Sequence, residues 1–167
     1  MTTRYTTLDS PCGPLLLVGE DSATARGGLA LASVSMTGQR NAAVVRPDWV
    51  EDAAAFREVA SQLRAYFAGG SDGFDLEFTS RGTEFQRRVW AALERLPYGS
   101  TTSYGALADQ AGLPRAAVRA LGAAIGANPL LVVRPCHRVV GADGSLTGYA
   151  GGLDRKRQLL DLEAGHS

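Results

Sequence analysis

The hydrophobic pattern of this chain changes near its middle, and the change constrains the fold more than any other feature. In the first half, Leu15–Val18 and Leu29–Leu31 are short apolar runs between glycine-rich turns, and Phe74–Phe78 alternates apolar with acidic residues. Both patterns are typical of strands. In the second half, apolar residues recur mainly at helical spacing. We therefore predict an α+β protein with a small domain at residues 1–78, built of a short antiparallel sheet plus a helix, and a mostly helical domain at residues 79–167.

Local signals place the first helices. Apolar residues at helical spacing from Phe56 to Phe67 predict one helix in the first domain, which ends before a glycine pair. In the second domain, Thr83 followed three residues later by Gln86 has the spacing of a capping box. We expect a helix to begin there and to end before Pro97.

A helix-turn-helix is predicted next. Ser103 can cap a helix that runs to Ala111, a Gly-Leu-Pro turn follows, and a second helix runs from Arg115 to Ala127. Apart from its arginines, one face of the second helix has almost no side-chain bulk; it comprises Arg115, Arg119, Gly122, Ala123 and Gly126. Glycine inside a helix costs about 1 kcal/mol relative to alanine, so this face indicates close approach of another surface. A nucleic-acid groove and a neighbouring helix are equally compatible with it.

The stretch Pro135-Cys136-His137-Arg138 carries the clearest chemical signal. It follows the apolar run Leu130–Val133, which is typical of a strand, so that a thiol, an imidazole and a guanidinium would lie together at the strand's end. Such surroundings can lower a cysteine pKa and produce a nucleophilic thiolate.

Other thiol chemistries fit the sequence less well. A zinc-deaminase signature needs a second cysteine where Val139 stands, and two cysteines with two histidines at these spacings do not form a structural zinc site. A CxxC redox motif is absent. A cysteine hydrolase with a Cys136–His137–acid triad stays open, although neighbouring residues on a strand point to opposite faces.

Composition and charge narrow the class of protein. The chain is 45% hydrophobic and 20% charged, as globular proteins are. No apolar run has the length of a membrane span and the N-terminus lacks a signal-peptide core, so we expect a cytoplasmic protein with reduced thiols. Residues 1–80 hold six arginines and ten acidic residues, a net charge of −4, whereas residues 81–167 hold eleven basic and seven acidic residues, a net charge of +4. The basic half hints at a phosphate-bearing partner.

Taken together, these motifs resemble the O6-alkylguanine-DNA alkyltransferase family, also called methylated-DNA–protein-cysteine methyltransferases. The resemblance covers nearly the whole chain. The motifs that carry it follow one another in the family's order and are Leu8–Leu15, Gly82–Gln86, Pro97–Gly99, Ser103–Gly105, Arg119–Gly122, Asn128–Pro129, Pro135–Val139 and Thr147–Leu153. A single Pro-Cys-His-Arg could arise by chance, but this ordered set is very specific.

The resemblance implies catalytic roles. Cys136 would accept the alkyl group from guanine O6, with a water linking it to His137 and with Glu163 orienting that histidine. Asn128 would tie the hinge to the active-site segment, and Tyr104 would donate a hydrogen bond to the leaving guanine. The transfer would need no cofactor and no metal, and each molecule would act once.

The resemblance also implies how DNA is bound. The base must leave the duplex to reach the thiol, and the pocket that receives it would be lined by Pro135, Val139, Tyr149 and Ala150. Arg119 would replace the flipped nucleotide in the stack. Its helix would enter the minor groove of double-stranded DNA containing O6-alkylguanine through a set of residues that also includes Arg115, Ala120, Gly122 and Ala123. We expect a monomer, and a non-enzymatic sensor of alkylated DNA is the alternative.

Three departures from the family pattern stand out. Arg134 occupies a position that is usually aliphatic and could face solvent, pair with an acid or touch a phosphate. The turn before Arg119 is one residue longer than usual, which makes Arg115 the alternative for the intercalating arginine. Ala150 replaces a serine found in some members. The sequence leaves open the preferred alkyl size, activity on O4-alkylthymine, cooperativity on DNA and protein partners.

Overall fold

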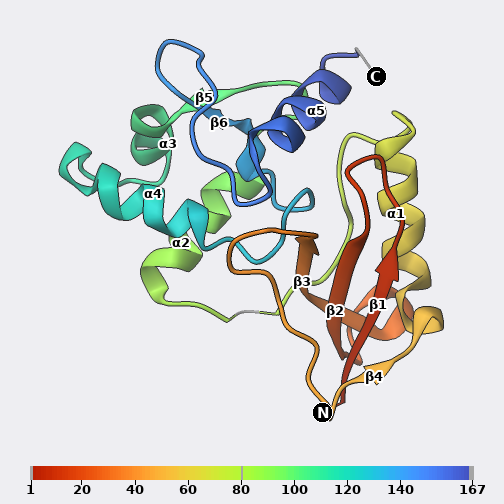
Figure 1. Ribbon diagram of the computed structural model, residues 1–167. Coiled ribbons are helices and arrows are strands. Elements are labelled where there is room, and N and C mark those ends of the chain that lie inside the picture. Colours follow the sequence, from red (N-terminus) through yellow and green to blue (C-terminus); the bar gives the residue numbers. More distant parts are fainter. Residues whose placement is uncertain (1, 80, 166–167) are drawn as a thin grey trace. The chain divides into compact units, whose positions relative to one another are not determined.

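The computed structural model describes residues 2–79 and 81–165, which fold as two compact units divided after Thr79 (Figure 1). The division lies one residue beyond the boundary expected from the sequence. The first unit combines a small sheet with one α-helix, and the second is mostly helical, so the predicted α+β class is confirmed. In the described part of the chain, no helix has the length and apolar character needed to cross a membrane.

The first unit is built on a four-stranded sheet in the order β3-β2-β1-β4. Strands β1 (Thr3–Leu8) and β2 (Leu15–Asp21) form an antiparallel hairpin, and β3 (Leu29–Met36) adds antiparallel to β2. The short β4 (Val50–Glu51) pairs in parallel with β1. The predicted apolar runs thus lie in strands, but the sheet is mixed and not purely antiparallel as predicted, because β4 joins its edge in parallel.

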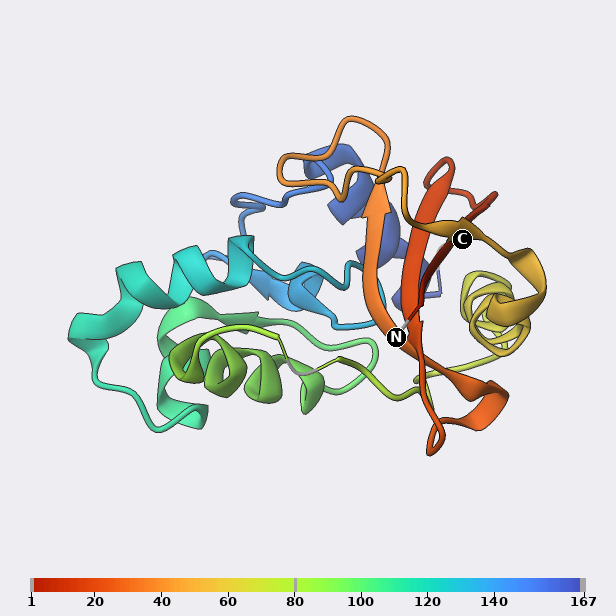
Figure 2. The ribbon, with the colours of Figure 1, turned by 90° about the horizontal axis from the view of Figure 1, so that it is seen from below.

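Helix α1 (Arg57–Phe67) lies alongside this sheet (Figures 1 and 2). A 3-10 turn, η2 (Ala53–Phe56), leads into it, and another, η1 (Arg26–Gly28), precedes β3. The predicted helix is confirmed, because its apolar spacing buries Val59, Leu63 and Tyr66 on one face.

The strand predicted at Phe74–Phe78 is wrong except at its end. Only Phe78 forms a bridge, in parallel with Leu31 of β3. Further back, the amide of Asp75 donates to Gln62 Oε1 at 2.7 Å, and its carbonyl accepts from Gln62 Nε2 at 3.0 Å. A side chain of α1 therefore satisfies backbone groups that a neighbouring strand would otherwise have bound.

In the second unit, the first helix begins where the sequence predicts. Helix α2 (Glu84–Glu94) has a complete capping box, because Thr83 Oγ1 accepts from the Gln86 amide at 3.0 Å and Gln86 Oε1 accepts from the Thr83 amide at 3.0 Å. Helix α5 (Leu153–Glu163) closes the chain. These two helices flank the helix-turn-helix and the candidate site in sequence.

The helix-turn-helix is also present. Helix α3 (Tyr104–Gln110) is capped by Ser103, and α4 (Val118–Gly126) packs against both α3 and α2 (Figures 1 and 2). The second helix does not begin at Arg115 as predicted: Arg115–Ala117 is a 3-10 turn, η3, in which the Ala117 amide binds the Pro114 carbonyl. The interval between the two α-helices is therefore longer than expected.

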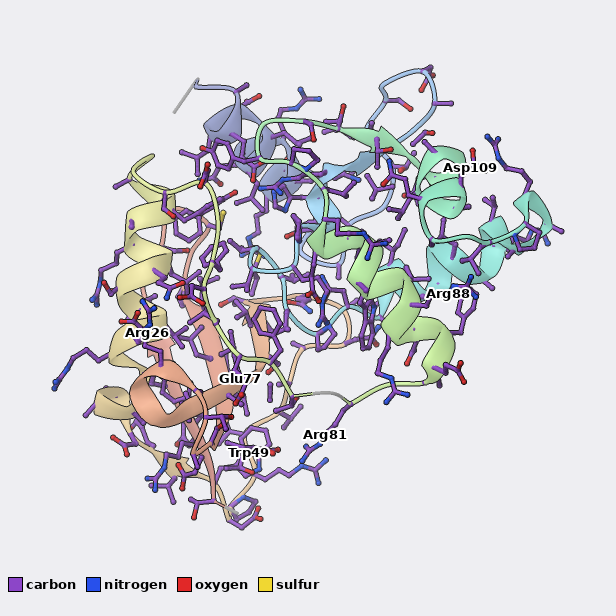
Figure 3. All side chains as sticks on the ribbon, turned by 180° about the vertical axis from the view of Figure 1, so that it is seen from behind. Arg26, Trp49, Glu77, Arg81, Arg88 and Asp109 are labelled. Atoms are coloured by element: carbon purple, nitrogen blue, oxygen red, sulfur yellow. The ribbon has the colours of Figure 1, made fainter. Side chains whose placement is uncertain are left out.

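Arginine side chains hold the turn between these helices. Arg88 of α2 donates to the carbonyls of Ala111 and Gly112 at 2.8 and 3.0 Å, and Arg115 donates to the carboxylate of Asp109 (Figure 3). Gly112 has a φ of +70°, and a β-carbon there would lie 2.8 Å from Arg88 Nη2. Glycine is thus favoured by the positive φ of the turn, and it leaves room for the Arg88 guanidinium.

The capping box gives a prediction about stability. Replacing Thr83 with alanine leaves the Gln86 amide without its cap, and we expect the free energy of unfolding to fall by about 1 kcal/mol. Urea unfolding measures the loss, and Thr101→Ala, at an exposed threonine outside any helix, is the matched control. Equal stability of the two variants would contradict a stabilising role for the cap.

Candidate active site

Cys136 opens a 3-10 turn, η4 (Cys136–Arg138), directly before the short strand β6 (Val139–Val140). Its side chain is buried, with 4% of the residue exposed. The predicted strand at Leu130–Val133 is wrong, because residues 131–133 form a turn and only Leu130 lies at an isolated β-bridge. Cys136 and His137 are therefore neighbours on a tight helical turn, and the objection that they must point to opposite faces of a strand does not apply.

Two γ-turns shape the approach to the nucleophile. Val132 has a φ of +70°, and the Val133 amide donates to the Leu131 carbonyl at 2.8 Å. A β-branched residue with positive φ is a genuine outlier, which costs roughly 1–3 kcal/mol. At Pro135, with φ −78° and ψ 62°, the Cys136 amide donates to the Arg134 carbonyl at 2.7 Å, as in an inverse γ-turn.

Asn128 supplies the contacts that hold this strained segment. Its side chain is buried, Oδ1 accepts from the Leu130 amide at 3.0 Å, and Nδ2 donates to the Arg134 carbonyl at 3.0 Å and to the Leu130 carbonyl at 3.4 Å. Because the Arg134 carbonyl also binds the Cys136 amide, Asn128 is connected to the nucleophile through one shared acceptor.

His137 and Glu163 form a buried pair. His137 Nε2 lies 2.7 Å from Glu163 Oε2, and both side chains are at most 1% exposed. An ionised carboxylate can only accept, so Nε2 carries the proton of the neutral ring and Nδ1 keeps its lone pair. Nδ1 is buried and has no hydrogen-bond partner among the described residues. It is the ring nitrogen that can accept a proton.

Arg138 contacts the same carboxylate. Its Nε donates to Glu163 Oε1 at 2.8 Å, its Nη2 donates to Oε2 at 2.9 Å, and its Nη1 donates to the Leu96 carbonyl. Burial lowers the pKa of His137; Glu163 opposes that effect, whereas Arg138 and Lys156 add to it. The ring is therefore neutral near pH 7. The sequence predicted Arg138 as a cation close to the thiol, but not its pairing with Glu163.

Lys156 is a buried cation that sequence reasoning missed. It is 1% exposed, and its Nζ donates to the carbonyl of Val139 at 2.6 Å and to those of Thr147 and Gly148 at 3.4 and 3.2 Å. It thereby joins β6 to the glycine-rich segment at residues 147–153. The sequence feature that could have revealed its burial is its helical spacing from Leu159 and Glu163, which places all three residues on one face of α5.

Burial dominates the electrostatics of the thiol. It raises the pKa of Cys136 to about 11, against the opposing effects of the Asn128 hydrogen bond and of the charges on Lys156 and Arg134. The prediction that these surroundings lower the pKa is thus wrong for the unbound protein, because removing the thiolate from water outweighs the nearby cations. Cys136 is a neutral thiol at pH 7 until another group takes its proton.

Strand pairing brings Tyr104 to this region. The short strand β5 (Thr102–Ser103) pairs in parallel with β6, and Tyr104 follows it as the first residue of α3. The Tyr104 hydroxyl lies 2.7 Å from Thr147 Oγ1 in the glycine-rich segment. That segment also carries Tyr149 and Ala150, both half-buried. The site is therefore built from three parts of the chain, of which the one that carries Tyr104 lies more than 30 residues before the other two.

The second helix of the helix-turn-helix exposes the face that the sequence singled out. Leu121, Ala124 and Ile125 are buried, whereas Arg119, Ala120 and Ala123 are exposed. A β-carbon added at Gly122 would meet no atom within 4 Å in the described part of the chain. This face is thus not used for packing between helices of the unit, which removes one of the two interpretations of its small residues.

The two candidate intercalating arginines differ in their surroundings. Arg115 pairs with Asp109 at 2.9 Å and lies over Gly105, where a β-carbon would be 2.8 Å from its guanidinium. Arg119 forms no ion pair or side-chain hydrogen bond with any residue that the structure describes, and it projects from α4 beside the small face. Arg119 is therefore free to reach a ligand, whereas Arg115 forms an exposed ion pair, which restrains it only weakly.

Arg134 and Arg138, which interrupt the apolar sequence near Cys136, both form ion pairs. Arg138 binds Glu163 as described above, and Arg134 donates to Glu94 Oε2 at 2.9 Å while its guanidinium lies 4.9 Å from the centre of the Trp90 ring. Of the three possibilities left open for Arg134, the structure thus shows pairing with an acid. Residues 2–79 and 81–165 contain no group of three or more His, Cys, Asp or Glu side chains suited to a metal.

Both units match domains of a known protein family. Residues 3–79 match the family described as 6-O-methylguanine DNA methyltransferase, ribonuclease-like domain, and residues 84–165 match its DNA binding domain. The methylated-DNA–protein-cysteine methyltransferase of Mycolicibacterium paratuberculosis is 52% identical over 164 residues, which are 98% of this chain and 94% of that protein. The Methanosarcina acetivorans protein of the same name is 48% identical over 160 residues, 95% of this chain and 97% of its own length.

A solved structure agrees with these matches. Mycobacterium tuberculosis OGT in complex with DNA superposes with a TM-score of 0.86 at 48% sequence identity, covering 100% of this chain and 95% of that one. The structure of the M. tuberculosis O6-methylguanine methyltransferase gives a TM-score of 0.84 at 47% identity, covering 99% and 95%.

The shared carboxylate gives a prediction. Arg138→Met leaves Glu163 buried without its guanidinium partner, and we expect the free energy of unfolding to fall by about 3 kcal/mol. The double variant Arg138→Met/Glu163→Gln no longer has the uncompensated charge and should recover part of the lost stability. Chemical denaturation measures both, with Arg157→Met at an exposed position of α5 as the control. A loss no larger than that of Arg157→Met would show that the pair is not stabilising.

Proposed function

The chain belongs to the family of methylated-DNA–protein-cysteine methyltransferases, and we propose that it reverses alkylation of guanine O6 in duplex DNA by transferring the alkyl group to Cys136. The observation that carries this proposal is the buried Cys136 beside the His137–Glu163 pair, in the same unit as an exposed helix face bearing Arg119. A thiol, a base oriented by a carboxylate and a surface for DNA are the parts that such a transfer needs.

The chemical step follows from the protonation states. Cys136 is a neutral thiol, so its proton must leave, and Nδ1 of His137 accepts it through a bridging water as the family resemblance implies. The sulfur lone pair then forms a bond to the alkyl carbon while the bond from that carbon to O6 breaks. Its electron pair moves onto the guanine, which takes up the proton that the thiol gave away. The products are an S-alkylcysteine and an unmodified guanine.

Tyr104 and the backbone stabilise the leaving base. Negative charge builds on guanine as the carbon–oxygen bond breaks, and a hydroxyl that donates to the ring favours that state. The contact of Tyr104 with Thr147, two residues before Tyr149, supports this role. In this proposal Val139 and Ala150 supply main-chain groups for the base edge. Tyr149 and Pro135 complete the walls of the pocket. Lys156 fixes the Val139 carbonyl and the segment that carries Tyr149.

DNA enters through α4. The target base must be extruded from the duplex, and Arg119 takes its place in the stack while Ala120, Gly122 and Ala123 allow the helix to lie close in the minor groove. Arg115, held by Asp109, has the lesser role of contacting the backbone. Contacts of this kind carry little sequence information, so binding depends on the lesion more than on its neighbours.

Single turnover and independence of a cofactor follow from the S-alkylcysteine product. A thioether is not hydrolysed under these conditions, so each molecule acts once and needs no cofactor. We propose that the protein acts as a monomer in the cytoplasm, where Cys12 and Cys136 persist as thiols and not as a disulfide. A damage sensor that only binds alkylated DNA would not need the acceptor thiol.

Intact-mass measurement tests the proposal. After incubation with duplex DNA carrying one O6-methylguanine, the protein should gain one methyl group, mapped to Cys136 and saturating at one per molecule. Cys136→Ser should bind the DNA without gaining mass, and Cys12→Ser should behave as the parent chain. Tight binding without any mass gain would favour the sensor, and repeated turnover on an ester or peptide would favour a hydrolase.

A second experiment separates the two arginines. Arg119→Ala should slow repair of duplex DNA by about tenfold, because the extruded state loses its replacement in the stack, and should affect reaction with free O6-benzylguanine far less. Arg115→Ala, which removes an arginine already paired with Asp109, is the matched control and should have the smaller effect on duplex repair. Single-turnover rates measure both. Equal losses on duplex and free base would remove the proposed role of Arg119.

A further inference from the structure

Arg134 is a buried cation two residues before the nucleophile, with no part in the reaction described so far. Its side chain is 7% exposed, it pairs with Glu94 at 2.9 Å, and its guanidinium lies over Trp90. Both partners belong to α2, and Trp90 is itself fixed because its Nε1 donates to the Ala124 carbonyl of α4 at 2.9 Å. The guanidinium is thus held in one place by a rigid support.

Burying this charge is unfavourable by itself. Loss of hydration lowers the pKa of Arg134, and the opposing attraction of Glu94 compensates only in part. A guanidinium nevertheless stays charged in proteins, so the full positive charge is retained. An aliphatic side chain of similar volume would avoid the penalty. The packing of the turn against α2 therefore does not explain why an arginine stands here.

The backbone of Arg134 is fixed relative to the thiol. Its carbonyl accepts from the Cys136 amide at 2.7 Å and from Asn128 Nδ2 at 3.0 Å. The main chain of Cys136 is therefore tied to the residue whose guanidinium is anchored on Trp90. Burial raises the pKa of Cys136, and the positive charge of Arg134 is one of the effects that oppose this rise, after the Asn128 hydrogen bond and the charge of Lys156.

Several other charges act near the thiol. Lys156 on α5 adds a second positive charge that favours the thiolate, and His137 is neutral next to the compensated pair of Glu163 and Arg138. Glu94 on α2 opposes Arg134. The Glu94 side chain is 39% exposed, so solvent screens its charge more than that of the buried guanidinium. The balance at the sulfur is positive.

From this arrangement we propose that Arg134 is a positioning residue of the transfer reaction, whose buried charge, supported by Trp90 and moderated by Glu94, favours the thiolate of Cys136 during attack. The inference rests on the proposed function, because it concerns the same thiol. Substitutions at Arg134 and Glu94, which are in direct contact, should therefore change the rate in opposite directions. A purely structural role would lower the rate in both variants.

The test is the pH dependence of the second-order rate constant with free O6-benzylguanine, a substrate that avoids any effect on DNA binding. Arg134→Met should lower the rate at neutral pH by about three- to tenfold and displace the pH profile to higher pH. The rates of the variant and of the parent chain should converge at high pH, where the thiolate forms in both. Glu94→Gln keeps a hydrogen-bonding side chain beside Arg134 but removes the negative charge. It should raise the rate at neutral pH by about twofold and displace the profile to lower pH.

Arg95→Met, which removes an exposed charge from the residue next to Glu94, is the control and should leave the profile in place. Losses in both test variants at every pH, without displacement of the profile, would mean that Arg134 and Glu94 only support the fold. If Arg134→Met does not fold, as thermal unfolding would reveal, the direction of the change in Glu94→Gln decides by itself. Failure of the parent chain to gain mass at Cys136 would instead overturn the proposed function.

Discussion

The buried carboxylate of Glu163 is the interaction on which the site depends. It lies at the end of α5 and binds the side chains of His137 and Arg138 in η4, and its Oε1 also accepts from the Gly99 amide at 3.3 Å. One carboxylate thereby joins the C-terminal helix to the turn that carries the nucleophile. Because its charge is balanced by Arg138, it can orient a neutral imidazole without forcing that ring to take a proton.

This compensation has a consequence for reactivity. Burial keeps Cys136 protonated in the unbound protein, and the neutral His137 retains a lone pair on Nδ1. A neutral thiol is a poor nucleophile, so burial limits its reaction with other electrophiles, and in the proposed mechanism the adjacent His137 is the base that activates it. The cations Lys156 and Arg134 reduce the penalty of forming the thiolate without abolishing it.

Where the sequence misled, hydrogen bonds from side chains to the main chain had replaced the strand pairing that the hydrophobic pattern predicts. The apolar run Leu130–Val133 reads as a strand, yet the buried amide of Asn128 binds its backbone groups and stabilises a positive φ at Val132. Likewise, backbone groups of Asp75 are taken up by the side chain of Gln62 instead of by a strand. Side chains that hydrogen-bond to main-chain groups compete with sheet formation, and periodicity does not reveal them.

The sequence by itself determined the helix starts at Thr83 and Ser103, the helix-turn-helix and the Cys136–Arg138 motif, because caps, turns and motifs act over a few neighbouring residues. Only the tertiary structure decided the protonation state of the thiol and the burial of Lys156 and Arg134. A lysine or arginine is normally exposed, and what buries these two are carbonyls, an aromatic ring and a carboxylate from segments remote in sequence. Charges are balanced in space, and that balance is set by the fold as a whole.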